Sequence, residues 1–186
     1  MTTEGAHIVG TRRLEIHVAD AESGPMLQNL REDPRVIPTL FGTTIAEASR
    51  SALVPDWQPT PSRTVFAARN RTSGELVGGL RLYQDKLSYF IDPRFWARGY
   101  GGEAVTALVA RLWEMHPTEK LRALVARENM ASRRILDQTG FEFAGLVPGT
   151  GTPRQQVPVL NYVAKRPGGI FFSASEPADI ASPRTD

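Results

Sequence analysis

The stretch Ile91-Asp-Pro-Arg-Phe-Trp-Ala-Arg-Gly-Tyr-Gly-Gly-Glu-Ala104 decides the fold, because the hydrophobic pattern changes period there. Before it, apolar and polar residues alternate as in β-strands, and after it apolar residues recur at helical spacing. The glycines between the two patterns allow close approach of the backbone to a ligand. The first turn of the helix that follows offers unpaired N–H groups and the positive end of the helix dipole. The stretch therefore predicts a strand, a glycine loop and a helix N-terminus suited to a phosphate or pyrophosphate.

Glycine spacing by itself leaves a second interpretation open, in which the loop is a tight turn and glycine serves only its geometry. The loop lacks the Lys-Ser/Thr pair of a P-loop, and it lacks the third glycine of the dinucleotide-binding G-x-G-x-x-G pattern. Arg98, at the mouth of the loop, would add a charge-assisted contact to an anion. On spacing alone we favour the turn.

The periodicity upstream and downstream of the loop predicts a single-domain α/β fold of the α+β type, with a central, mostly antiparallel sheet. Asp20 is placed to cap the first helix, and Thr43 or Thr44 the second. The predicted strands span residues 11–18, 64–69, 76–83, 87–91, 121–125, 141–147 and 157–164, and the predicted helices follow Asp20, Thr43 or Thr44, the glycine loop and Asn129.

The chain of 186 residues has room for one domain, which we place at residues 11–166. We expect residues 1–10 to be a flexible N-terminus. Residues 167–186 are rich in Ser, Pro, Ala and Asp, and we expect a disordered tail there. No apolar run approaches the roughly eighteen residues of a membrane span, and no secretory signal is visible. These features predict a cytoplasmic protein.

Charge and composition exclude several classes of function. The net charge of +2 is too small for a dedicated nucleic-acid-binding protein, although it suits an anionic small ligand. The chain has no cysteine, which excludes disulfides, thiolate metal sites and cysteine nucleophiles. Its three histidines are scattered, so we expect no metal. An RGG-like nucleic-acid patch at residues 98–102 would require disorder and repetition, and the sequence has neither.

Two motifs in this order resemble the GNAT superfamily of N-acyltransferases, and within it the branch of ribosomal-protein N-terminal (alanine) acetyltransferases and their small-molecule relatives. Trp-Ala-Arg-Gly-Tyr-Gly-Gly-Glu-Ala at residues 96–104 is similar to W-G-K-G-Y-A/G-x-E-A of that branch. Residues 128–141 are similar to its E-N-x-A-S-x-R-x-L-x-K-x-G-F motif, and residues 11–14 to its T-x-R-L start. The resemblance covers about residues 11–165.

The resemblance implies a mixed sheet with splayed strands, helices on both faces, and acetyl-CoA as cosubstrate. It implies that the loop amides bind the coenzyme pyrophosphate and that the preceding strand pairs with the pantetheine arm. The backbone of Ile91 would donate to the thioester oxyanion, Asn129 would bind the pantetheine, and Ser132 would protonate the thiol. The coenzyme-binding residues implied are Phe90, Ile91, Arg98, Gly99, Tyr100, Gly101, Gly102, Glu103, Asn129 and Ser132.

Proton transfer is where the sequence departs from the family pattern. Leu136 occupies the position of the tyrosine that serves many members as general acid, and there is no acidic residue between Glu142 and Glu176. Ser132 has a structural alternative, a first-turn helix hydroxyl bonded to backbone. The base stays unassigned, with a water chain or one of three side chains as options: His17, Glu32 and Asp85.

The favoured function is an N-acetyltransferase that moves an acetyl group from acetyl-CoA to a primary amine, either a protein N-terminus or a small molecule. The alternative is a non-catalytic acyl-CoA-binding or sensing module on the same fold, motivated by the missing tyrosine and carboxylate. Trp57 would either line the acceptor cleft or pack beneath its loop. We expect a monomer or homodimer that binds neither nucleic acid nor membrane.

Overall fold

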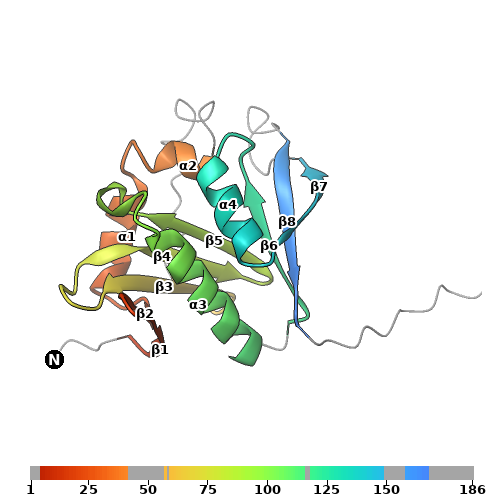
Figure 1. Cartoon of the computed structure of the whole chain (residues 1–186). Coiled ribbons are helices and arrows are strands. Elements are labelled where there is room, and N and C mark those ends of the chain that lie inside the picture. The colour runs from red at the N-terminus through yellow and green to blue at the C-terminus, as the bar shows by residue number, and fades with distance from the viewer. Residues whose placement is uncertain (1–4, 42–56, 58, 116–117, 149–157, 168–186) are drawn as a thin grey trace, which may run out of the picture.

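An eight-stranded sheet forms the framework of the molecule, with strand order β1-β2-β3-β4-β5-β6-β8-β7 (Figure 1). This computed structural model describes residues 5–41, 57, 59–115, 118–148 and 158–167. The strands are β1 His7–Gly10, β2 Leu14–Val18, β3 Arg63–Asn70, β4 Leu76–Tyr83, β5 Lys86–Ile91, β6 Lys120–Val125, β7 Glu142–Val147 and β8 Val159–Lys165. The helices are α1 Ser23–Arg31, α2 Ile37–Phe41, α3 Tyr100–Met115 and α4 Met130–Gln138, with a 3-10 turn η2 at Pro93–Phe95.

The predicted α/β class and the mostly antiparallel sheet are confirmed. Among the described strands, every neighbouring pair is antiparallel except β5 and β6. Asp20 caps α1 as predicted, since its Oδ1 accepts from the N–H groups of Glu22 (3.1 Å) and Ser23 (2.7 Å). None of the helices in the described part of the chain has the length and hydropathy that a bilayer span requires.

The expectation of a flexible N-terminus is wrong for His7–Gly10, which forms β1 and pairs with β2. The strand predicted over residues 11–18 begins only at Leu14, because Thr11 N–H donates to the Leu14 carbonyl at 2.8 Å and closes a turn. α2 was not predicted; it begins at Ile37, shortly after Pro34. The helix predicted after Thr43 or Thr44 lies outside the described residues.

Helices cover both faces of the sheet, as the resemblance implies. Along β3, Phe66 and Ala68 point into a core that includes α3 and α4, whereas Val65 and Ala67 point into a core that includes α1. This alternation follows from the two-residue period of a strand. Figure 1 shows α3 and α4 in front of the sheet and α1 behind it.

The sheet is split between β5 and β6, where the implied splayed strands are observed. The two strands pair only through Lys86 and Arg122, and Arg122 N–H donates to the Asp85 carbonyl at 2.7 Å. The Arg122 guanidinium also binds the Asp85 carboxylate, at 2.7 and 2.8 Å. Beyond this vertex the strands diverge (Figure 1). The fold therefore leaves one border of β5 without a neighbouring strand.

Candidate active site

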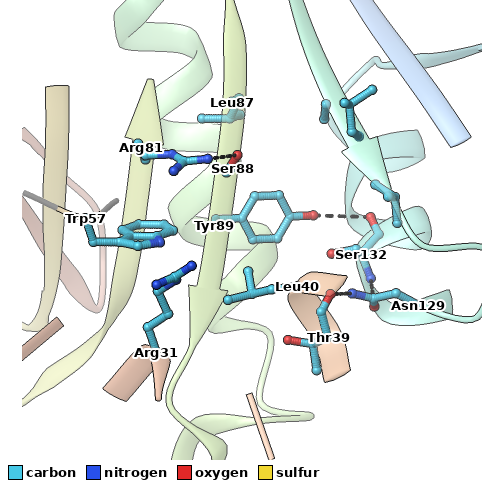
Figure 2. Close-up of a pocket in the computed structure, with 13 residues that line it drawn as sticks. Arg31, Thr39, Leu40, Trp57, Arg81, Leu87, Ser88, Tyr89, Asn129 and Ser132 are labelled. Carbon is cyan, nitrogen blue, oxygen red and sulfur yellow. Dashed lines mark hydrogen bonds between the residues drawn. The ribbon is translucent and has the colours of Figure 1, made fainter. Parts of the chain in front are cut away.

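A cavity of about 90 Å³ lies at the split in the sheet (Figure 2). Its lining comes from both diverging strands, from α1, α2 and α4, and from Trp57. Arg81 on β4 donates to the Ser88 hydroxyl at 3.2 Å, and its guanidinium lies 5.3 Å from the Trp57 ring. The described lining residues are Arg31, Thr39, Leu40, Trp57, Arg81, Leu87, Ser88, Tyr89, Ala123, Leu124, Val125, Asn129 and Ser132.

The backbone of β5 presents Ile91 to the open side of the split. Asp92 N–H donates to the Val77 carbonyl at 2.8 Å, so the backbone of Asp92 faces β4. Since successive residues of a strand face opposite borders, Ile91 N–H faces away from β4, toward the gap. Its carbonyl on the same border accepts the Trp96 indole N–H at 2.6 Å. Ile91 therefore offers an outward donor where the strand ends.

Phe90 has the opposite orientation, which differs from its expected role in binding the pantetheine arm. It pairs with Gly79 in the ladder of β4, and the same alternation directs its backbone groups at that strand. Its side chain is 3% exposed and packs on Trp57, with the ring centroids 4.4 Å apart. Trp57 itself is 2% exposed and packs in the core with Phe90, and it also lines the cavity, so both interpretations of this residue hold in part.

The glycine loop runs directly into α3, as predicted. Gly99 has a φ of +78°, which glycine adopts without strain, and Glu103 N–H donates to its carbonyl at 3.1 Å to close the first turn. The N–H groups between these two residues therefore have no carbonyl partner within the helix. A Cβ added at Gly102, in the first turn of α3, would meet nothing within 4 Å outside its own helix, so this turn has open space beside it.

Gly101 and Glu103 are turned toward the protein. A Cβ at Gly101 would lie 2.9 Å from Ile135 Cδ1 and 3.4 Å from Ile91 Cγ1. The Glu103 carboxylate accepts hydrogen bonds from Thr11 and Arg13. Any role of these two positions in coenzyme binding therefore falls to their backbone. Of the other loop residues, Arg98 is exposed and Tyr100 is half-buried.

The Asn129 side chain, expected to bind the pantetheine arm, has two partners within the protein. Its Oδ1 accepts from Ser132 N–H at 3.0 Å and caps α4, and its Nδ2 donates to the Thr39 carbonyl at 2.7 Å. Figure 2 shows both bonds. An asparagine at this position thus ties α4 to α2 and closes one end of the cavity.

Ser132 lines the cavity, and Tyr89 approaches it from β5 (Figure 2). The Tyr89 hydroxyl donates to the Ser132 carbonyl oxygen at 3.2 Å. Burial raises the pKa of Tyr89 to about 12, so its phenol stays protonated at neutral pH. The Ser132 hydroxyl has no hydrogen bond to any described residue. The sequence analysis did not identify Tyr89 as a site residue. The one feature that could have indicated it is its position in the predicted strand before the glycine loop.

None of the three options for a base lines the cavity. The Asp85 carboxylate is held by Arg122, whose hydrogen bonds keep its pKa below the usual value. Nδ1 of His17 lies 3.3 Å from the Gly5 carbonyl oxygen, and Glu32 accepts from Gln28 on the surface of α1. Across the described ranges, no group of three or more His, Asp or Glu side chains is arranged to hold a metal ion.

Solved structures with the same fold are numerous, and three illustrate them. One is ribosomal-protein-S5-alanine acetyltransferase from Vibrio fischeri, with a TM-score of 0.67 at 10% identity over 88% of this chain and 98% of that one. A second is ribosomal L7/L12 α-N-protein acetyltransferase in complex with coenzyme A, with a TM-score of 0.67 at 15% identity over 86% and 98%. A third is spermidine N-acetyltransferase from Vibrio cholerae in complex with coenzyme A and spermine, with a TM-score of 0.65 at 13% identity over 84% and 97%.

No curated protein matches the sequence. The profile of one sequence family does match, over residues 13–142, and its description is acetyltransferase (GNAT) domain. This range includes the glycine loop, both strands at the split and all of α4, so the match covers the candidate site. Together with the shared architecture, it means that the chain belongs to the GNAT acetyltransferase domain family.

Proposed function

We propose that the protein transfers the acetyl group of acetyl-CoA to a primary amine, on a protein N-terminus or a small molecule, by direct attack in a ternary complex. The observation that carries the proposal is the split between β5 and β6, with an outward backbone donor at Ile91 and the glycine loop immediately after it. An extended pantetheine arm fits beside β5, where a neighbouring strand would otherwise pair. The amides of residues 98–103 then lie at the end where its pyrophosphate would follow.

The reaction needs a donor for the negative charge that develops on the thioester oxygen. We assign this role to Ile91 N–H, because it faces the gap and belongs to a strand fixed on its other border by β4. The loss of one such donor costs about 3 kcal/mol of transition-state stabilisation. Alignment of the amine and the thioester in one cavity supplies a further part of the rate.

The departing thiolate needs a proton, and Ser132 is the residue we assign to it. Its hydroxyl lines the cavity, in the first turn of α4, where the helix N-terminus also favours a developing negative charge. The amine would enter on the side of α1, α2 and Trp57. No described carboxylate or histidine lines the cavity, so we propose that water carries the amine proton away and returns a proton to the Ser132 hydroxyl.

Calorimetric titration with acetyl-CoA tests the proposal, with ATP as the control for general affinity toward nucleotides. Micromolar binding of acetyl-CoA without binding of ATP is the expected result. Thiol release is then followed with N-terminal peptides, polyamines and amino acids as acceptors. Coenzyme binding without thiol release for any amine would favour the acyl-CoA-binding module instead, and a folded protein that binds no acetyl-CoA would refute both functions.

A further inference from the structure

Arg13, just before β2, contacts the glycine loop and the start of α3 at several points. Its Nε donates to Glu103 Oε2 at 2.6 Å, and its backbone N–H donates to Glu103 Oε1 at 3.0 Å. Its Nη1 donates to the Arg98 carbonyl at 2.9 Å. The guanidinium also lies 4.3 Å from the centroid of the Tyr100 ring. One side chain thus touches the loop at its start, its middle and its end.

Glu103 poses an electrostatic problem for a pyrophosphate site. Burial raises the pKa of its carboxyl group, but the hydrogen bonds from Thr11 and Arg13 outweigh burial and leave the pKa below its usual value. The side chain is therefore ionised, and it is only 18% exposed. A carboxylate in the first turn stabilises the helix itself, yet it repels an anion bound at the same N-terminus. A neutralising partner removes that repulsion.

The bond to the Arg98 carbonyl has a second effect on the loop. In a trans peptide the C=O and the following N–H point in opposite directions. Because the Arg98 carbonyl is directed at Arg13, the N–H of Gly99 points to the other side, away from Arg13. The positive φ of Gly99 then turns the chain into α3. Donors that are already oriented bind an anion without the cost of ordering the loop.

We propose that Arg13 is a positioning residue for the pyrophosphate of acetyl-CoA: it neutralises Glu103 and fixes the peptide between Arg98 and Gly99 in its binding orientation. The inference rests on the proposed function, since it assumes a coenzyme at the loop. It assigns Arg13 no contact with the thioester or the amine. We therefore expect Arg13 to affect the binding only of those acetyl donors that carry a pyrophosphate.

Two acetyl donors separate this role from a general structural one. Acetyl-CoA carries the pyrophosphate, whereas S-acetylpantetheine has the same thioester and pantetheine arm without it. We expect Arg13→Ala to raise the KM for acetyl-CoA by about tenfold or more, the loss typical of a charge-assisted contact, with kcat and the kinetics of S-acetylpantetheine unchanged. In Arg13→Ala/Glu103→Gln, part of the affinity for acetyl-CoA should return, because the unpaired carboxylate is gone.

Arg71→Ala is the matched control. Arg71 also pairs with a carboxylate, that of Glu15 at 2.9 Å, and donates to a backbone carbonyl, that of Thr11 at 3.0 Å, but the structure gives it no contact with the loop. Its substitution should leave the kinetics with both acetyl-CoA and S-acetylpantetheine unchanged. Arg13→Lys, which keeps the charge and loses the forked geometry, should fall between wild type and Arg13→Ala and serves if the alanine variant does not fold.

Three results would overturn the inference. In the first, Arg13→Ala, or Arg13→Lys in its place, leaves the KM for acetyl-CoA unchanged. In the second, the variant impairs both donors equally, which indicates a structural role alone. In both of these, wild-type binding of acetyl-CoA still supports the proposed function. A wild-type protein that is folded and binds no acetyl-CoA would remove the function and the inference together.

Discussion

The Tyr89 hydroxyl donates a hydrogen bond to the Ser132 carbonyl oxygen, 3.2 Å away, and so joins β5 to the first turn of α4. This bond spans the region where the sheet is split (Figure 2). Ile91 lies two residues further along β5, so the bond sets the spacing between the proposed oxyanion donor and the proposed proton donor, Ser132. The relative position of these two groups therefore depends on a residue that the family motifs do not contain.

Tyr89→Phe removes this bond and should lower the free energy of unfolding by about 1 kcal/mol at neutral pH. Because burial raises the pKa of Tyr89 to about 12 from an ordinary value of 10.0, folding opposes ionisation of the phenol. The stability that the tyrosine contributes is present below pH 10 and is lost as the pH rises toward 12. Urea unfolding of both proteins at increasing pH should show their difference shrinking above pH 10. A difference that stays constant would contradict the prediction.

Gly102 and Gly101 should respond differently to added side chains. Gly102→Ala places a methyl group in open space and should leave stability equal or higher, since alanine favours a helix. It should still weaken acetyl-CoA binding, because the methyl group obstructs the approach of the ligand to the loop. Calorimetric titration and thermal unfolding measure the two effects. Unchanged affinity in Gly102→Ala would argue against a phosphate site at this turn.

Gly101→Val should destabilise the protein by about 1–3 kcal/mol even without ligand, because its side chain would be forced against Ile135 and Ile91. Loss of coenzyme binding in this variant would therefore report a displaced helix as much as a blocked site. Thermal unfolding of the free protein is the direct measurement. A melting temperature equal to that of the wild type would show that the helix start accommodates the extra volume.

Asn129→Ala should lower the free energy of unfolding by about 1 kcal/mol, since it removes the cap of α4 and the bond to the Thr39 carbonyl. Asn129→Ser is the matched variant, because its hydroxyl keeps a capping acceptor and has no amide donor for the Thr39 carbonyl. It should recover part of the lost stability. If Asn129→Ala instead leaves stability unchanged and weakens acetyl-CoA binding, its side chain acts on the ligand rather than on the helix.

Asp20 should make the protein sensitive to acid. Hydrogen bonds from Ser23, from its backbone N–H first and then its hydroxyl, lower the pKa of Asp20 to about 2 from 3.8. The stability that Asp20 contributes is therefore complete above pH 3.8 and is lost as the pH falls toward 2. The difference in unfolding free energy between wild type and Asp20→Ala should shrink over that window. Since the donors are uncharged, added salt should change it little, and a strong salt dependence would contradict this cause.

The sequence predicts those helices, strands and turns that are specified by their own residues rather than by contacts with distant parts of the chain. The strand, loop and helix around Gly99 follow from a change of hydrophobic period and from glycine chemistry, and the structure has them in that order. Asp20 capped its helix as expected, for a similarly local reason. β1 was missed because its four residues are stabilised by pairing with β2, and no local pattern marks such a short strand.

The finer features of the site depend on contacts between distant parts of the chain. Which border of β5 Phe90 and Ile91 face is set by the register with β4, and a shift of one residue would exchange them. The partners of Asn129 include Thr39, which is far away in sequence. Arg13 reaches Glu103 across a similar separation. The family motifs contain Arg13, Glu103 and Asn129 without indicating what their side chains contact.

The single paired position between β5 and β6 divides the sheet into two halves, one running from β1 to β5 and the other from β6 through β8 to β7. Few backbone hydrogen bonds cross from one half to the other. A donor molecule lying in the split would contact both halves and act as a removable strand. The two halves of the sheet would then be held together more firmly while the coenzyme is bound, and they would be free to move relative to each other each time the spent coenzyme leaves.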